Sequence, residues 1–164
     1  ELVAERLSGL QQGSSFVTTA MQWGKDNEAA AREMYEFATG ATVALVGFVI
    51  HPSSRWAGAS PDAFVNNDGI VSIKCPLSAT HIATLLGAQI DPDYMTQMQW
   101  EMACSGRAWC DFVSYQPFFP EGKRLVVSRV LRDEALILAH DKAVIAFLAE
   151  VDAKVEAIRN WKAA

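Results

Sequence analysis

The segment GASPDAFVNNDGIVSIKCP, residues 58–76, is the part of the chain around which the other elements can be arranged. It reads as an extended stretch, a turn at residues 67–69, and a short strand that ends at Pro76. Asp-Gly between two apolar runs is a strong hairpin signal, and we expect Gly69 to supply the positive φ that such turns need. The segment is therefore predicted to form a β-hairpin.

The second strand of this hairpin should have two unlike faces, because side chains alternate along a strand. One face carries the apolar side chains of Val71, Ile73 and Cys75. Ser72 and Lys74 point the other way, toward a side that Asp62 can approach across the hairpin. A carboxylate and an ammonium group are costly to bury without partners. A bound metal ion with a lysine that activates water is one reason to keep them there.

This pattern resembles the active-site hairpin of the phage lambda exonuclease family, the YqaJ-type viral recombination nucleases of the PD-(D/E)xK superfamily. The resemblance rests on Ser-Pro-Asp at 60–62 and Ile-Lys-Cys-Pro at 73–76, and it runs from the first predicted helix to about Ile158. It implies an α/β fold with a central mixed β-sheet flanked by helices. It also implies one nuclease-like domain over residues 1–164, without the N-terminal segment that grips the 5′-phosphate in this family.

The resemblance also implies the site residues. The metal ligands would be Asp62, Glu28, the main-chain carbonyl of Ile73 and the residue at position 72. Lys74 would position or activate the attacking water, and Gln97 would contact the region of the scissile phosphate. From the residues alone, each has a plainer interpretation. These are a turn aspartate at 62, a helix-surface pair of Glu28 with Arg32, a solvated strand lysine at 74, and a core amide at 97.

Two positions depart from the family pattern. Ala63 stands where the family usually has glycine, and Ser72 stands where it has a metal-binding glutamate. A hydroxyl is neutral and short, so the site loses a full charge and a group that can bridge two ions. Two interpretations remain. In the first, which we favour for the chemistry, the nuclease activity has been weakened or abolished, by natural decay or by engineering. In the second, the activity is retained with a rearranged metal site. The first predicts that Ser72→Glu raises Mg²⁺-dependent DNA digestion at least tenfold, or ~1.4 kcal/mol in barrier.

The remaining elements are predicted from periodicity and capping signals. Helices are expected at 1–12, 18–39, 78–86, 92–105 and from 132 to the end, and strands at 42–50, from 55, 108–115 and 124–130. The helix at 18–39 should bury a stripe that includes Trp23, Met34 and Phe37. The apolar run at 42–50 predicts one strand covered on both faces. His51, His81 and His140 are expected in a turn, at a helix start and on a helix surface.

Composition sets limits on the class of protein. A hydrophobic content of 51% and a charged content of 20% are typical of a globular domain, and no apolar run approaches the ~20 residues that span a bilayer. Cys75, Cys104 and Cys110 have no metal-type spacing, which favours free thiols in a reducing cytosol, here that of a bacterial host. A net charge of −5 does not suggest DNA binding, although it does not exclude a local basic lining.

The resemblance implies a Mg²⁺-dependent exonuclease, with Mn²⁺ as a substitute, that digests duplex DNA from its ends in the 5′ to 3′ direction. It would expose single strands for a phage annealing protein and form a homotrimeric ring around DNA. Such a ring could gather Lys25, Arg32, Arg107 and Lys123 on its inner surface. The alternative is a catalytically inactive DNA-binding or assembly protein. Phe118 and Phe119, in the loop at 116–122, would then contact a partner, unless this loop packs on the core. No membrane partner is expected.

Overall fold

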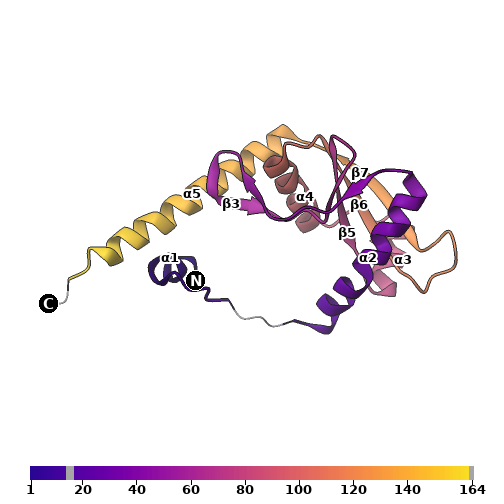
Figure 1. Cartoon of the computed structure of the whole chain (residues 1–164), viewed down its shortest axis with the longest axis horizontal. Helices are drawn as coiled ribbons and strands as arrows, with labels where there is room; N and C mark the ends of the chain where they lie inside the picture. Colours follow the sequence, from indigo (N-terminus) through magenta and orange to yellow (C-terminus); the bar gives the residue numbers. More distant parts are fainter. Residues whose placement is uncertain (14–16, 163–164) are drawn as a thin grey trace. The chain divides into compact units, whose positions relative to one another are not determined.

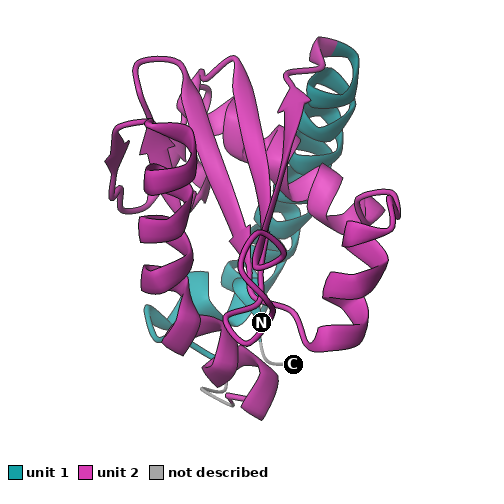
Figure 2. Ribbon diagram, turned by 90° about the vertical axis from the view of Figure 1, so that its right-hand side faces the viewer, with its two compact units in different colours: residues 1–16, 135–164 teal, residues 17–134 magenta. Residues whose placement is uncertain are grey.

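The computed structural model describes residues 1–13 and 17–162, and the chain forms two compact units (Figure 2). The larger unit takes residues 17–134, and the smaller takes 1–16 with 135–164. Each unit is described by itself. The expectation of one domain over residues 1–164 stays a prediction.

The smaller unit contains helix α1, Leu2–Ser8, and nearly all of α5, Glu134–Arg159. An ion pair joins Arg6 of α1 to Asp152 of α5. The first helix is shorter than predicted because Gly9 takes a left-handed conformation, with φ of 70°, and ends it. Within the described residues, no helix is both long and apolar enough to cross a membrane.

The larger unit is built on a five-stranded mixed sheet in the order β1-β4-β5-β6-β7 (Figure 1). Its strands are Val43–Ala44, Ala63–Val65, Gly69–Lys74, Trp109–Tyr115 and Leu125–Leu131. Strands β5 and β6 run parallel, and the other neighbours are antiparallel. Parallel neighbours need a crossover connection, and helices α3, Ser78–Leu85, and α4, Pro92–Ser105, provide it. The predicted α/β class with a central mixed sheet is confirmed.

Helix α2, Thr19–Thr39, packs against one face of this sheet. Its predicted ends are confirmed: the Thr18 hydroxyl accepts a hydrogen bond from the main-chain N–H of Met21, and Gly40 ends the helix in a left-handed conformation. The predicted buried stripe is confirmed only in part, because Met34 packs against the core cluster while the centre of the stripe lies elsewhere. Ala31 and Tyr35 are buried with Val71 and Val113, whereas Phe37 of the expected stripe is strongly exposed.

Packing and hydrogen bonding both explain why the buried face of α2 is centred on Ala31 and Tyr35. Ala31 is small, so the helix can approach the sheet closely there. The hydroxyl of Tyr35 donates a hydrogen bond to the buried Asp111 carboxylate over 2.6 Å, and Arg129 pairs with the same carboxylate at 2.8 Å. Glu28 lies three residues before Ala31 and seven before Tyr35, which places it on the sheet-facing side of the helix.

Helix α4 packs against the opposite face. Its Met98 and Met102 form a core cluster with Ile70 of β5 and with Cys110 and Phe112 of β6. The two helices therefore cover both faces of β5. The predicted polar face of β5 is therefore covered at position 72, where the Ser72 side chain is 0% exposed. The predicted start of α4 is confirmed, since Asp91 accepts a hydrogen bond from the N–H of Asp93. The predicted cap of α3 is wrong, since Leu77 and not Ser78 is at that position.

The predicted hairpin is confirmed, with Val65 paired to Gly69 across the turn. The expected role of Gly69 is wrong, because the positive φ, 48°, belongs to Asn66. Gly69 instead makes room for the indole of Trp109 on the neighbouring strand. A Cβ at position 69 would lie 2.2 Å from that ring.

The prediction of one doubly covered strand at 42–50 is wrong. The run divides between β1 and β2, Val49–His51, and β2 pairs with β3, Ser54–Ala59, in a separate two-stranded sheet. This second hairpin is attached to α4. The buried His51 ring stacks on Trp100 with centroids 4.9 Å apart, and the Trp100 indole donates a hydrogen bond to the Gly58 carbonyl.

The expected place of His81 near a helix start is confirmed, because it is the fourth residue of α3. The side chain is also buried there. Its two ring nitrogens hydrogen-bond Ser114 and the Lys123 carbonyl, each at 2.8 Å. His81 is thus a core residue whose ring nitrogens both have partners.

Candidate active site

Asp62 lies directly before β4, beside the end of β5. The pairing of Ala63 with Val71 brings its carboxylate to β5, where Oδ2 accepts a hydrogen bond from the Ile73 N–H over 2.6 Å. Burial raises the pKa of Asp62, the Ile73 hydrogen bond and the Lys74 charge oppose this, and the Glu28 charge adds to it. Asp62, Lys74 and Glu28 are therefore close enough to influence one another electrostatically.

Lys74 is the last residue of β5, and it contacts α4. Its Nζ donates a hydrogen bond to Gln97 Oε1 over 3.1 Å and lies 4.8 Å from the centroid of the Tyr94 ring. The Gln97 amide in turn donates from Nε2 to Glu101 Oε1 over 2.6 Å. A lysine, an amide and a carboxylate thus form one continuous hydrogen-bonded chain from the sheet to the helix.

Glu28 faces a hollow of about 450 Å³ that also reaches Ile73 and Lys74. The lining comes from α2, the end of β5 and α4: Ala20, Met21, Trp23, Gly24, Glu28, Ile73, Lys74, Cys75, Pro76, Leu77 and Tyr94. Glu28 also lies 3.6 Å from Arg32, as the plainer interpretation expected. Burial, with the charges of Glu28 and Asp62, raises the pKa of the Cys75 thiol to about 11, so this thiol is neutral near pH 7.

Ser72 lies between Ile70 and Lys74 on the face of β5 that α4 covers. Its hydroxyl oxygen is buried and has no hydrogen-bond partner among residues 1–13 and 17–162. A buried hydroxyl without a partner costs about 1–3 kcal/mol, so the space around it is polar but incompletely satisfied.

Glu101 was not predicted as a site residue, and the structure places it here. Glu101 is 2% exposed, and its second oxygen, Oε2, has no hydrogen-bond partner in the part of the chain that the structure describes. Burial raises the pKa of Glu101 to about 7; the Gln97 hydrogen bond lowers it, the Asp62 charge raises it, and the Lys74 charge lowers it. A signal was present in the sequence, because Glu101 follows Gln97 by one helical turn and lies among Met98, Met102 and Cys104. A carboxylate on an apolar helix face needs an explanation.

These donors fit a divalent cation. Mg²⁺ is usually held by one or two carboxylates, with water and phosphate oxygens completing its shell. Asp62 and the Ile73 carbonyl lie at one place on the hairpin, and the partnerless Glu101 oxygen is buried within reach of the Asp62 charge. Among residues 1–13 and 17–162, no three His, Cys, Asp or Glu side chains form a cluster for a metal ion.

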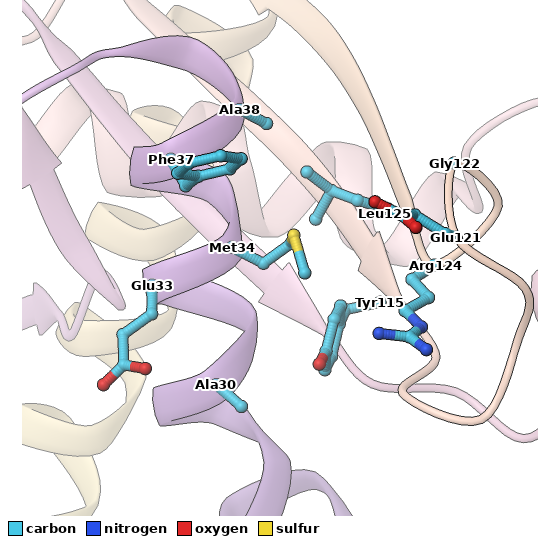
Figure 3. A pocket seen from close by; sticks show the side chains of 10 residues that line it. All are labelled: Ala30, Glu33, Met34, Phe37, Ala38, Tyr115, Glu121, Gly122, Arg124 and Leu125. Carbon is cyan, nitrogen blue, oxygen red and sulfur yellow. The ribbon is translucent and has the colours of Figure 1, made fainter.

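A second hollow, of about 780 Å³, lies elsewhere on the larger unit (Figure 3). Figure 3 shows Met34 and Phe37 of α2 facing Tyr115 and Leu125 of the sheet. None of the predicted site residues lines it, so the larger hollow and the candidate site are separate.

The mixed sheet, the hairpin and the flanking helices give this chain the fold of solved exonucleases of the nuclease-fold class. Residues 1–108 match the YqaJ-like viral recombinase domain, and the chain belongs to this family. The predicted family is thereby confirmed.

Solved structures agree with this assignment. An alkaline exonuclease, LHK-Exo, from Laribacter hongkongensis is 42% identical over 96% of this chain and 79% of its own, with a TM-score of 0.89. LHK-Exo in complex with dAMP has 43% identity, the same coverage and a TM-score of 0.88. A phage-related exonuclease from Haemophilus somnus 129PT, at 16% identity, shares the fold over 96% of this chain and 81% of its own, with a TM-score of 0.71. No curated protein sequence matches the chain.

Proposed function

We propose that this protein is a metal-dependent exonuclease that degrades one strand of duplex DNA from its ends. The observation that carries the proposal is the meeting of Asp62, Lys74 and Glu28 at the end of β5, beside a hollow that opens onto Ile73. The relatives support it, because LHK-Exo is an alkaline exonuclease and one of its structures is a complex with dAMP.

Each site residue would have a role that follows from its position. Asp62, Glu28 and the Ile73 carbonyl would hold Mg²⁺, or Mn²⁺ as a substitute, and Ser72 could add only a neutral oxygen. The cation would supply positive charge that neutralises the phosphate and favours ionised water. Lys74 would orient the attacking water from its ammonium group. Gln97, which holds Lys74 at 3.1 Å, would present that ammonium to the phosphate in one geometry.

The proposal extends to the direction of digestion, 5′ to 3′, and to a role in phage-type recombination beside a single-strand annealing protein. It also includes a homotrimeric ring around DNA. Lys25 and Lys123 are exposed and fit its inner lining best. Arg32 is paired with Glu28, and Arg107 donates to the Asn66 carbonyl and stacks on Phe64, so these two have local roles already.

The decisive experiment follows duplex DNA labelled at either the 5′ or the 3′ end. Mg²⁺ should release 5′-labelled nucleotide first, EDTA should stop release, and Lys74→Met should lower the rate at least about a hundredfold, the range seen for loss of a proton-transfer group. Light scattering should give three times the chain mass. Release of the 3′ label first would overturn the direction, and a monomer would overturn the ring.

The alternative is a DNA-binding or assembly protein without activity, and Ser72 is the observation that favours it. Phe118 is 82% exposed and is the aromatic residue available to a partner. Phe119 packs edge-on against His81 with centroids 4.9 Å apart, which leaves it a core role. Binding of duplex ends with no release of nucleotide, in Mg²⁺ or Mn²⁺, would establish this alternative.

A further inference from the structure

Ser72 and Glu101 face the same space between β5 and α4. On β5, Ile70 packs against Met98 and Lys74 hydrogen-bonds Gln97, so Ser72, midway between them, points at α4 as well. On α4, Glu101 lies one turn beyond Gln97 and directly before Met102, which shares the cluster with Ile70. The two side chains come from opposite walls of one buried space.

Each of these side chains has an oxygen that lacks a partner. The Ser72 hydroxyl and Glu101 Oε2 are both buried and make no hydrogen bond with the described residues. Burying the carboxylate without a partner costs more free energy than burying the hydroxyl, because the charge as well as the hydrogen-bonding capacity is removed from water. Glu101 Oε1 is satisfied by Gln97, so its orientation is held while the other oxygen stays available.

Glu101 is also placed within reach of the hairpin's charged groups. The Asp62 carboxylate and the Lys74 ammonium both act on its ionisation, in opposite directions. Two carboxylates that repel each other across a buried space are a common arrangement where a cation is bound, because the cation removes the repulsion. The pair Asp62 and Glu101 meets that description with donors from a hairpin and a helix.

We infer that Glu101 supplies, from helix α4, the metal-binding carboxylate that position 72 does not provide, and that it holds the divalent cation together with Asp62. The inference deepens the proposed function, and it takes from that proposal only the location of the cation site. A carboxylate that reaches the same space from the opposite wall restores the charge lost at Ser72. Gln97 is then a positioning residue, since it orients both Glu101 and Lys74.

The test is Mn²⁺ binding to the full chain, measured by calorimetry and by electron paramagnetic resonance in the absence of DNA. Glu101→Gln keeps the size and a hydrogen-bond acceptor for Gln97 but removes the charge, and it should weaken Mn²⁺ binding at least about tenfold. The swap, Ser72→Glu with Glu101→Ser, should return affinity to within about threefold of the original, because it moves one carboxylate across the same space. Glu121→Gln, on an exposed loop, is the matched control and should bind as the original does.

Thermal unfolding of each variant shows whether it folds. If the double variant Ser72→Glu with Glu101→Ser does not fold, Glu101→Gln alone tests the inference. The inference is overturned if Glu101→Gln binds Mn²⁺ as tightly as the original, or if the original binds none. The proposed function fails separately. Mn²⁺ binding that depends on Glu101, without any digestion of duplex DNA, would support the metal site and remove the exonuclease.

Discussion

The Lys74 ammonium donates a hydrogen bond to Gln97 Oε1 over 3.1 Å, which ties the end of β5 to helix α4. The contact joins a hairpin residue to a helix residue that lies 23 positions later in the chain. It also fixes the orientation of the amide, because an oxygen that accepts from Lys74 leaves Nε2 to donate to Glu101. Lys74 and Glu101 are therefore positioned through one shared side chain.

Gln97→Ala should lower the rate of DNA digestion about tenfold and destabilise the chain by about 1–3 kcal/mol, because it leaves a buried Glu101 oxygen without its donor. Lys74 loses the acceptor that holds it, and Glu101 loses the donor that orients it. Single-turnover digestion measures the first effect, and thermal unfolding measures the second. Thr96→Ala, at the exposed neighbouring position, is the control and should digest DNA at the original rate. An unchanged rate for Gln97→Ala would remove Gln97 from the site.

Ser72→Glu alone should destabilise the protein by about 1–3 kcal/mol and should not raise DNA digestion. Position 72 is fully buried, and a second carboxylate there would share its space with Glu101. This expectation replaces the tenfold gain predicted from the sequence, which rested on restoring the glutamate that the family has at position 72. The free energy of unfolding and the rate of DNA digestion, both measured for Ser72→Glu, decide between the two expectations. A tenfold gain with Glu101 in place would favour the interpretation that the activity was lost through Ser72.

Without divalent cations, stability should fall as the pH rises from about 4.5 to about 7. The pKa of Glu101 is raised to about 7 in the folded chain from its ordinary value of 4.5, so over this range the unfolded chain releases a proton that the folded chain keeps. The loss is on the order of 3–4 kcal/mol, at about 1.4 kcal/mol for each pKa unit. Asp62, whose pKa is also raised, acts in the same direction. Unfolding of the original chain and of Glu101→Gln in EDTA measures it, and the variant should lose most of the slope.

Gly69→Ala should destabilise the chain by about 1–3 kcal/mol, because the new Cβ would overlap the Trp109 ring from the neighbouring strand. The matched control is Gly47→Ala, where the added Cβ meets no atom within 4 Å and the φ angle is not positive. Urea unfolding of both variants gives the difference. Equal midpoints would mean that Trp109 moves aside at little cost.

Signals that act over a few residues were sufficient for much of the fold. Helix α2 begins after Thr18 and ends before Gly40, α4 begins after Asp91, and residues 66–68 form the turn of the hairpin, because caps and turns depend on the nearest peptide groups. Strand alternation predicted that Asp62 approaches Lys74, and the Lys74 charge does act on the Asp62 carboxylate. The electrostatic influence of Glu28 on Asp62 agrees with its predicted place, while its role as a ligand stays a prediction.

The sequence by itself thus determined helices α2 and α4 with their ends, and the hairpin that carries Asp62 and Lys74. Only the tertiary structure decided that α4 covers the Ser72 face of β5, which made Ser72 a core residue and brought Glu101 to the site. That outcome depends on a crossover through two helices and on packing between residues about thirty positions apart. No local propensity encodes such packing, because apolar burial is non-directional and depends on which surfaces meet in space.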